Sequence, residues 1–182
     1  MDKKEMRRLV RERKAQLNEE ERKRESDEVC RKVMATDKWQ NAKTTLLYWA
    51  LKDETDVGLL IDDLYTRGGT VLLPTCVGDD LVLRVYEGKE KMRIGDFDIA
   101  EPTGRIFEEK DYGKIELVIV PGMAFDNKGG RLGRGRGFYD RLLKKLPNCH
   151  KMGVCWSVQM VDEVVMEEDD VRMDQLIMKN EK

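Results

Sequence analysis

A strand–helix–strand stretch in the first half of the chain decides the fold. It opens with Thr44-Thr-Leu-Leu-Tyr-Trp-Ala50, an unbroken apolar and aromatic run that is typical of a strand buried on both faces. Apolar residues then recur at helical spacing over 56–67, and Gly68-Gly69 follows as a helix C-cap. A second apolar run, Thr70-Val-Leu-Leu73, is halted by Pro74. This pattern predicts two parallel strands joined by a right-handed helical crossover.

Further strands and helices alternate along the rest of the chain. We expect a helix at 138–146 and strands at the following positions: 81–86, 115–120, 151–156 and 175–179. The polar stretch 87–114 is interpreted as loops with little regular structure. Alternating strands and helices predict a three-layer α/β sandwich with a mostly parallel central sheet.

The N-terminal region is expected to be helical, because it consists of good helix formers without Gly or Pro. Asn18 followed by Glu21 resembles a capping box, which divides the region into two helices near Leu17. A length of 182 residues favours one domain with a sizeable core. We therefore expect a single domain over 1–182, with N-terminal helices at about 2–35 and an α/β core at about 44–179.

Composition narrows the class of protein. Apolar residues make up 40% and charged residues 38%, with a formal net charge of only -2, so no global field for a polyanion is expected. The basic N-terminus lacks an aromatic stacking set, which argues against a nucleic-acid partner. No apolar run approaches the roughly 20 residues of a membrane span, and no secretory signal opens the sequence. Four cysteines without a CxxC pair indicate reduced thiols in a cytoplasmic protein.

The most informative segment runs from Pro121 to Asp140, between an expected buried strand and an expected helix. Glycines allow backbone N–H groups to surround an anion, and interleaved arginines add charge. The glycines and arginines concerned are Gly129, Gly130, Arg131, Gly133, Arg134, Gly135, Arg136 and Gly137. No Gly-Lys-Ser/Thr is present, and Phe138 stands where a dinucleotide loop has its third glycine. The segment predicts a polyphosphate cradle at the carboxyl end of a strand, with a flexible basic hairpin as the alternative.

This segment resembles the hallmark of the 5-formyltetrahydrofolate cyclo-ligases, also called methenyltetrahydrofolate synthetases. That hallmark is Pro-Gly-x-x-Phe-Asp, a spacer, and then Arg-Leu-Gly-x-Gly-x-Gly-Tyr/Phe-Tyr-Asp. The chain matches it from Pro121 to Asp140 with Phe at 138, and the likeness extends from Lys3 to about Met178. The resemblance implies a fold shared with sugar-phosphate isomerases and CoA transferases.

The resemblance also implies an ATP site. The family opens with Lys-x-x-x-Arg on its first helix, which reaches the ATP phosphates; Lys3 and Arg7 fit best, and Lys4 with Arg8 is an alternative register. The implied ATP-binding residues are Lys3, Arg7, Arg131, Gly133, Arg134, Gly135, Arg136, Gly137, Phe138 and Tyr139.

A folate site is implied beside it. Glu54 matches a Glu that contacts the pterin, and Trp49 takes the position of an apolar residue lining the folate site. Taken alone, Trp49 is more typical of a core residue and Glu54 of an ordinary loop residue. The implied substrate-binding residues are Trp49, Glu54, Arg134, Gly135, Arg136, Gly137 and Phe138. Glu101-Pro102 matches a Glu-Pro of the family whose role stays open.

Asp140 and Asp170 resemble the family's Mg²⁺ ligands, and Asp170-x-x-x-Asp174 fits its C-terminal pattern. Carboxylate oxygens shared with phosphate suit Mg²⁺ well. Met178 replaces the Thr that often follows the last strand, and no His precedes Asp170, so the C-terminal match is weaker than the match of the glycine-rich segment.

The implied reaction is ATP-dependent closure of 5-formyltetrahydrofolate to 5,10-methenyltetrahydrofolate, with Arg134, Arg136 and Tyr139 as catalytic residues. Such chemistry needs alignment and charge neutralisation rather than a covalent nucleophile. This agrees with a chain whose one histidine, His150, has no nucleophilic partner set. Two alternatives are a phosphosugar isomerase, for which no carboxylate base is evident, and a binder without turnover. We expect a monomer, with a dimer as the alternative, and small molecules as the only partners.

Overall fold

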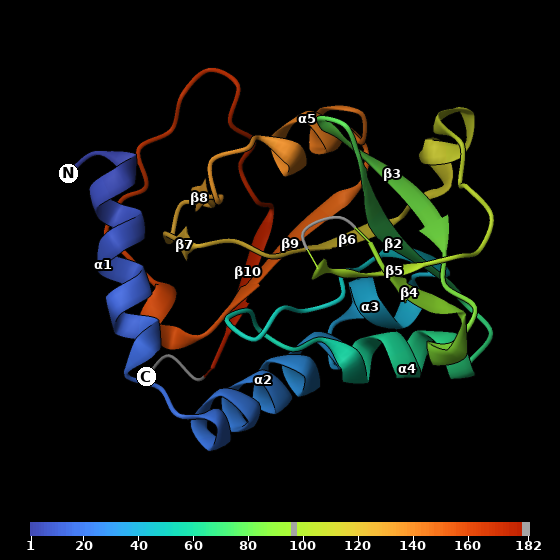
Figure 1. Cartoon of the computed structure of the whole chain (residues 1–182), viewed down its shortest axis with the longest axis horizontal. Helices are drawn as coiled ribbons and strands as arrows, with labels where there is room; N and C mark the ends of the chain where they lie inside the picture. The colour runs from blue at the N-terminus through green and yellow to red at the C-terminus, as the bar shows by residue number, and fades with distance from the viewer. Residues whose placement is uncertain (96–97, 180–182) are drawn as a thin grey trace.

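The computed structural model describes residues 1–95 and 98–179. Within those residues, one six-stranded sheet has the order β10-β9-β6-β1-β2-β3 (Figure 1). Its strands are β1 Thr44–Leu46, β2 Thr70–Val77, β3 Asp80–Val85, β6 Leu117–Val120, β9 His150–Cys155 and β10 Gln175–Met178. Every neighbouring pair is parallel except β2 and β3, which are antiparallel. The prediction of a mostly parallel central sheet is confirmed.

Helices cover both faces of this sheet (Figure 1). Alternate residues of β6 show the layering, because Leu117 and Ile119 pack with one buried cluster and Val118 and Val120 with the other. A strand buried on both faces needs apolar side chains at every position. The helices of the first layer are α2 Glu19–Met34, α3 Asp37–Asn41 and α4 Gly58–Thr66, and the second layer contains α5 Phe138–Lys144.

The first helix, α1 (Lys3–Ala15), lies apart from these layers (Figure 1). Its buried residues Met6 and Val10 pack into a third apolar cluster with the short hairpin β7–β8. That hairpin, Ala124–Phe125 and Arg131–Leu132, lies within the glycine-rich segment. The packing therefore brings α1 beside the segment that follows β6.

The predicted boundary between α1 and α2 is confirmed. The Asn18 side chain accepts the Glu21 N–H at 2.8 Å, and the Glu21 carboxylate accepts the Asn18 N–H at 3.1 Å. This reciprocal capping satisfies two of the N–H groups that lack partners at the start of a helix.

Two strand predictions were wrong in length. The strand expected over 44–50 ends at Leu46, and β2 continues through Pro74 instead of stopping there. Residues 72, 74 and 76 of β2 point their backbone groups toward β1, as the bond from Leu47 N–H to Leu72 O shows. Because β1 has already ended, the missing N–H of Pro74 breaks no ladder bond.

The interpretation of 87–114 as loops was also wrong in part. It contains the antiparallel strands β4 Met92–Ile94 and β5 Ala100–Pro102, and the 3₁₀ segment Glu109–Lys114. The backbone N–H of Cys76 in β2 donates to the Glu101 carboxylate of β5 at 2.9 Å, which ties this hairpin to the edge of the cavity described below.

Other features bear on the class of protein. None of the four cysteines, all of which lie in the described part of the chain, forms a disulfide; Cys30, Cys149 and Cys155 are buried and Cys76 is half-buried. Burial raises the pKa of the Cys30 and Cys149 thiols to about 12, which keeps both protonated and unreactive at neutral pH. Among the described residues, no helix is both long and apolar enough to cross a membrane.

Candidate active site

A cavity of about 430 Å³ opens at the centre of the sheet's carboxyl edge. From β1 the chain adds β2 on one side, whereas β6, β9 and β10 extend the sheet on the other. Open α/β sheets bind ligands where the strand order reverses in this way. The cavity is lined by Tyr48, Trp49 and Glu54 after β1 and by Pro121 and Gly122 after β6.

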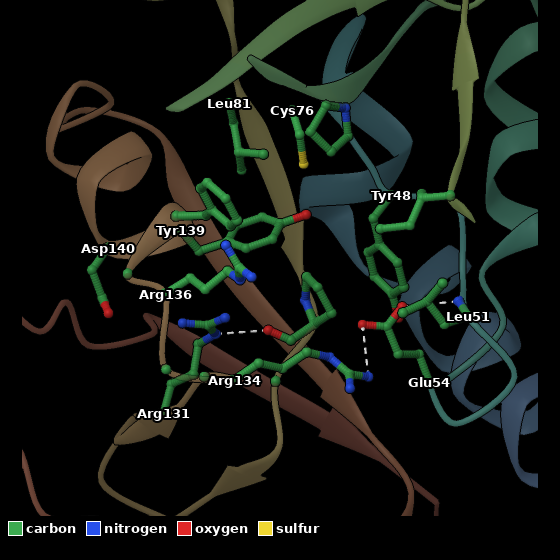
Figure 2. Close-up of a pocket in the computed structure, with 18 of the residues that line it drawn as sticks. Tyr48, Leu51, Glu54, Cys76, Leu81, Arg131, Arg134, Arg136, Tyr139 and Asp140 are labelled. Atoms are coloured by element: carbon green, nitrogen blue, oxygen red, sulfur yellow. Dashed lines mark hydrogen bonds and ion pairs between the residues drawn. The ribbon is translucent and has the colours of Figure 1, made fainter. Parts of the chain in front are cut away.

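Arg131 forms the rigid floor of the glycine-rich side (Figure 2). Its Nε donates to the Pro121 carbonyl at 2.7 Å, and its guanidinium lies 5.2 Å from the centre of the Tyr139 ring. Burial lowers the pKa of Arg131, and the nearby Asp140 carboxylate opposes that shift. The buried guanidinium is therefore held in place by its hydrogen bond to Pro121 and its contact with the Tyr139 ring.

Arg134 reaches from the glycine-rich segment to the opposite wall (Figure 2). Its guanidinium lies 2.8 Å from an Asp53 oxygen and 3.5 Å from a Glu54 oxygen. Burial lowers the pKa of Arg134, but these carboxylates raise it by more. Asp53 also pairs with Lys14, a buried residue of α1, at 3.2 Å. Neither Asp53 nor Lys14 was predicted from the sequence.

The first helix supplies two more cations. Arg7 Nε donates to the Gly133 carbonyl at 2.8 Å, and Lys3 Nζ lies 2.7 Å from Asp170. Both side chains line the cavity. In the alternative register, Lys4 is exposed and Arg8 pairs with Glu12 on the outer surface. Of the two registers, only Lys3 with Arg7 faces the cavity.

Asp140 and Asp170 form an acidic corner beside these cations. Asp140 accepts the Val171 N–H at 3.1 Å, so the first turn of α5 and the C-terminal segment are held together. Burial alone would raise the pKa of Asp170, but the hydrogen bond from Lys3 and the Glu167 N–H lower it overall. Asp174 does not line the cavity and instead accepts the Lys151 N–H at 2.8 Å.

This corner fits a metal ion that is shared with phosphate. Among the described residues, no group of three or more His, Cys, Asp or Glu side chains is placed to hold a metal alone. Mg²⁺ is commonly bound by one or two carboxylates together with phosphate oxygens and water. Asp140 and Asp170 match that donor set, and the Lys3 ammonium already lies against Asp170 as a positive charge.

The other end of the cavity is largely apolar. Pro74, Cys76 and Leu81 line it beside Tyr139, and Figure 2 shows Leu81 and Cys76 on the Tyr139 side. Burial raises the pKa of the Tyr139 hydroxyl, so this group stays protonated and can donate a hydrogen bond. Trp49 packs near Tyr86, with ring centres 6.1 Å apart. This apolar and aromatic lining suits a planar heterocycle.

Comparison with known proteins identifies the family. The model of the 5-formyltetrahydrofolate cyclo-ligase family matches residues 1–179. The chain belongs to this family.

Its relatives agree with that membership. The chain is 32% identical over 171 residues to a probable 5-formyltetrahydrofolate cyclo-ligase of Schizosaccharomyces pombe, covering 84% of this chain and 83% of the relative. It is 26% identical to the 5-formyltetrahydrofolate cyclo-ligase of Escherichia coli, covering 90% and 92%. The solved structure of Aquifex aeolicus 5,10-methenyltetrahydrofolate synthetase superposes with a TM-score of 0.84 at 31% identity, covering 97% of this chain and 89% of that one.

The residues that the family resemblance implied for binding ATP, folate and metal all line the cavity, whereas Asp174 does not. The cavity is lined by Lys3, Arg7, Trp49, Glu54, Arg131, Gly133, Arg134, Gly135, Arg136, Gly137, Phe138, Tyr139, Asp140 and Asp170. Gly135 and Gly137 have positive φ, 109° and 72°, which the turn into α5 requires. His150 lies outside the cavity lining and pairs with Gln175 at 3.0 Å.

Sequence reasoning missed part of the cyclo-ligase cavity. Tyr48 was read as strand, but its hydroxyl donates to the Thr55 carbonyl at 2.6 Å and its ring lines the cavity. Cys76 was interpreted as a reduced thiol and Leu81 as a strand residue, and neither was given a role in the site. Glu101 was singled out only through its Glu-Pro pair, and that pair does not indicate that the residue lines the cavity.

Proposed function

We propose that this chain closes 5-formyltetrahydrofolate to 5,10-methenyltetrahydrofolate with conversion of ATP to ADP and phosphate. One observation carries the proposal: cations from α1 and from the glycine-rich segment meet at one end of a cavity whose other end is apolar. The names of the family relatives support it. We propose further that residues 1–182 act as one cyclo-ligase domain in the cytoplasm.

The cationic end holds the triphosphate in this proposal. Arg131, Arg134 and Arg136 approach from the glycine-rich segment, and Lys3 and Arg7 approach from α1. Guanidinium groups pair with phosphate oxygens in a bidentate manner. Arg134 is held by carboxylates in this structure, so phosphate binding exchanges one anionic partner for another. The remaining ATP contacts come from Gly133, Gly135, Gly137, Phe138 and Tyr139.

The apolar end holds the folate. Trp49 and Phe138 contribute aromatic surface, and Glu54 accepts N–H groups of the pterin. The family's substrate set adds Arg134, Gly135, Arg136 and Gly137, which lie between the two ends. The two substrates then meet at the arginines of the glycine-rich segment.

The reaction follows from that alignment. The formyl oxygen on N5 attacks the γ-phosphorus of ATP, the bond to ADP breaks, and an imidate-like phosphate forms. The N10 amine attacks the formyl carbon, N10 loses its proton, and phosphate leaves as the five-membered ring closes. Arg134 and Arg136 neutralise charge that develops on the phosphoryl oxygens, and Tyr139 donates a hydrogen bond from its protonated hydroxyl.

Asp140 and Asp170 would hold Mg²⁺ in this scheme. When bound, the ion supplies positive charge to the phosphate oxygens and fixes their orientation. The chain's own contribution is to place the two carboxylates together, through the bond from Val171 N–H to Asp140 and the pairing of Lys3 with Asp170.

The test is the near-ultraviolet absorbance of the methenyl product after mixing the protein with 5-formyltetrahydrofolate, Mg²⁺ and ATP. We expect the band to appear only with ATP and to vanish when the metal is chelated. No band despite measurable ATP binding would leave the nucleotide site standing and refute the folate reaction. A band that survives chelation would refute the metal assignment alone.

A further inference from the structure

Glu101 is a buried carboxylate in the wall of the cavity. It lies on β5, in the hairpin that is hydrogen-bonded to β2 through Cys76, and only 5% of the residue is exposed. It lines the cavity together with Pro74, Cys76 and Leu81. Carboxylates are almost never this deeply buried unless a cation or several hydrogen-bond donors compensate them.

The protein compensates this carboxylate incompletely. Its Oε2 accepts the Cys76 N–H at 2.9 Å, and no other hydrogen bond or ion pair reaches the carboxylate from the residues that the structure describes. Its Oε1 lies against Gly95, where an added Cβ would come within 1.9 Å of it. A glycine at position 95 leaves room for the Glu101 carboxylate, so the hairpin's own sequence allows the carboxylate to lie there.

Glu54, the other glutamate that lines the cavity, is in a different situation. Its Oε1 accepts the Leu51 N–H at 2.9 Å, and its Oε2 lies 3.5 Å from Arg134. The protein thus gives Glu54 a cationic partner, whereas no cation among the described residues pairs with Glu101 at the apolar end. A ligand that offers N–H donors at the apolar end would supply what Glu101 lacks.

We propose that Glu101 is a second carboxylate of the folate site, which accepts N–H donors of the pterin's amino-pyrimidinone edge and thereby fixes the ring's orientation. This inference rests on the proposed function. The pterin has adjacent ring and amino N–H groups, which one carboxylate can accept together. Recognition of such donors by a buried acceptor discriminates strongly against rings that lack them.

The experiment compares Glu101→Gln with the wild-type chain. The amide oxygen can still accept the Cys76 N–H, but its NH₂ group then faces the donors of the ligand. We expect the KM for 5-formyltetrahydrofolate to rise by roughly tenfold or more, as for loss of a charged acceptor, with the KM for ATP unchanged. Glu116→Gln is the matched control, because Glu116 also accepts backbone N–H groups, at Lys43 and Thr44, but does not line the cavity.

Gly95→Ala gives a second, independent variant. The added methyl displaces the carboxylate without removing it, and Gly95 has no positive φ that would strain an alanine. We expect weaker binding of 5-formyltetrahydrofolate in calorimetric titrations without ATP, and an unchanged affinity for ATP.

The outcomes separate this inference from the proposed function. If the wild-type chain turns over and Glu101→Gln has the same folate KM and folate affinity, only the role of Glu101 is overturned. If the wild-type chain binds the folate without turnover and Glu101→Gln binds it more weakly, the reaction is overturned and the role of Glu101 is supported. A wild-type chain that neither binds nor converts the folate overturns both.

Discussion

Replacing Arg134 with alanine separates catalysis from stability. In the structure, Arg134 spans the cavity to Asp53 and Glu54 with 44% of its side chain exposed. After its removal Asp53 keeps Lys14 at 3.2 Å, whereas Glu54 keeps the Leu51 N–H at 2.9 Å and loses the cation 3.5 Å away. The perturbation therefore removes one cation from the site without leaving Asp53 unpaired.

The two expected magnitudes differ widely. An ion pair this exposed contributes about 0–1 kcal/mol to folding, since solvent screens it. For a chain of this size that corresponds to a loss of at most about 2–4 °C in Tm. A positioned charge that stabilises a transition state is worth about 10²–10³ in rate, or about 2.7–4 kcal/mol. Because Arg134 is half exposed, we expect the lower end, a loss of about 100-fold in kcat.

The assay follows methenyl product by absorbance for the wild-type and Arg134→Ala chains, and scanning calorimetry gives Tm for both. Arg8→Ala is the control, since Arg8 also forms an exposed ion pair, with Glu12, but lies outside the cavity. Unchanged kcat and KM in Arg134→Ala would refute the phosphate-cradle reasoning. A large fall in Tm would instead show that the arginine is structural.

Further predictions concern the first helix, the metal and the core. Arg7→Ala should raise the KM for ATP, whereas Arg8→Ala should leave it unchanged; equal effects in steady-state kinetics would refute the register. Asp170→Asn should raise the Mg²⁺ concentration needed for half-maximal rate. Because the folded-state pKa of Asp170 is lowered, its pairing with Lys3 stabilises the chain above the ordinary carboxyl pKa, and this is lost as pH falls through the folded value. Denaturant titrations should therefore show a smaller deficit for Asp170→Asn at pH 3 than at pH 7, and an equal deficit at both would contradict the pairing. Leu64→Ala, at a fully buried position, should lower the unfolding free energy by about 2–5 kcal/mol, and a loss below that range would show that the core collapses around the gap.

The fold was predictable where the sequence pattern follows directly from burial or from local hydrogen bonds. β6 is apolar at every position because helices pack on both of its faces, and Asn18 with Glu21 marks a helix start by chemistry that acts within four residues. The cavity-lining positions that a compact motif carries, such as Arg131 and Asp140, were predictable for a similar reason, since the glycine-rich segment is continuous in sequence.

What escaped prediction depends on contacts between distant segments. Pro74 continues β2 only because β1 ends early, and the residues around Pro74 do not indicate how long β1 is. The pairing of Asp53 with both Lys14 and Arg134 joins three separate parts of the chain. The hairpin that carries Glu101 has strands of three residues each, too short for a period of two to stand out from loop sequence.

The contact between Lys3 and Asp170 joins positions 167 residues apart. In the order of the chain, α1 precedes these partners by every strand of the sheet except β10. The Lys3 ammonium therefore cannot meet the carboxylates of Glu167 and Asp170 until residue 170 has been synthesised. We expect the corner formed by Lys3, Asp140 and Asp170 to be among the last parts of this domain to fold.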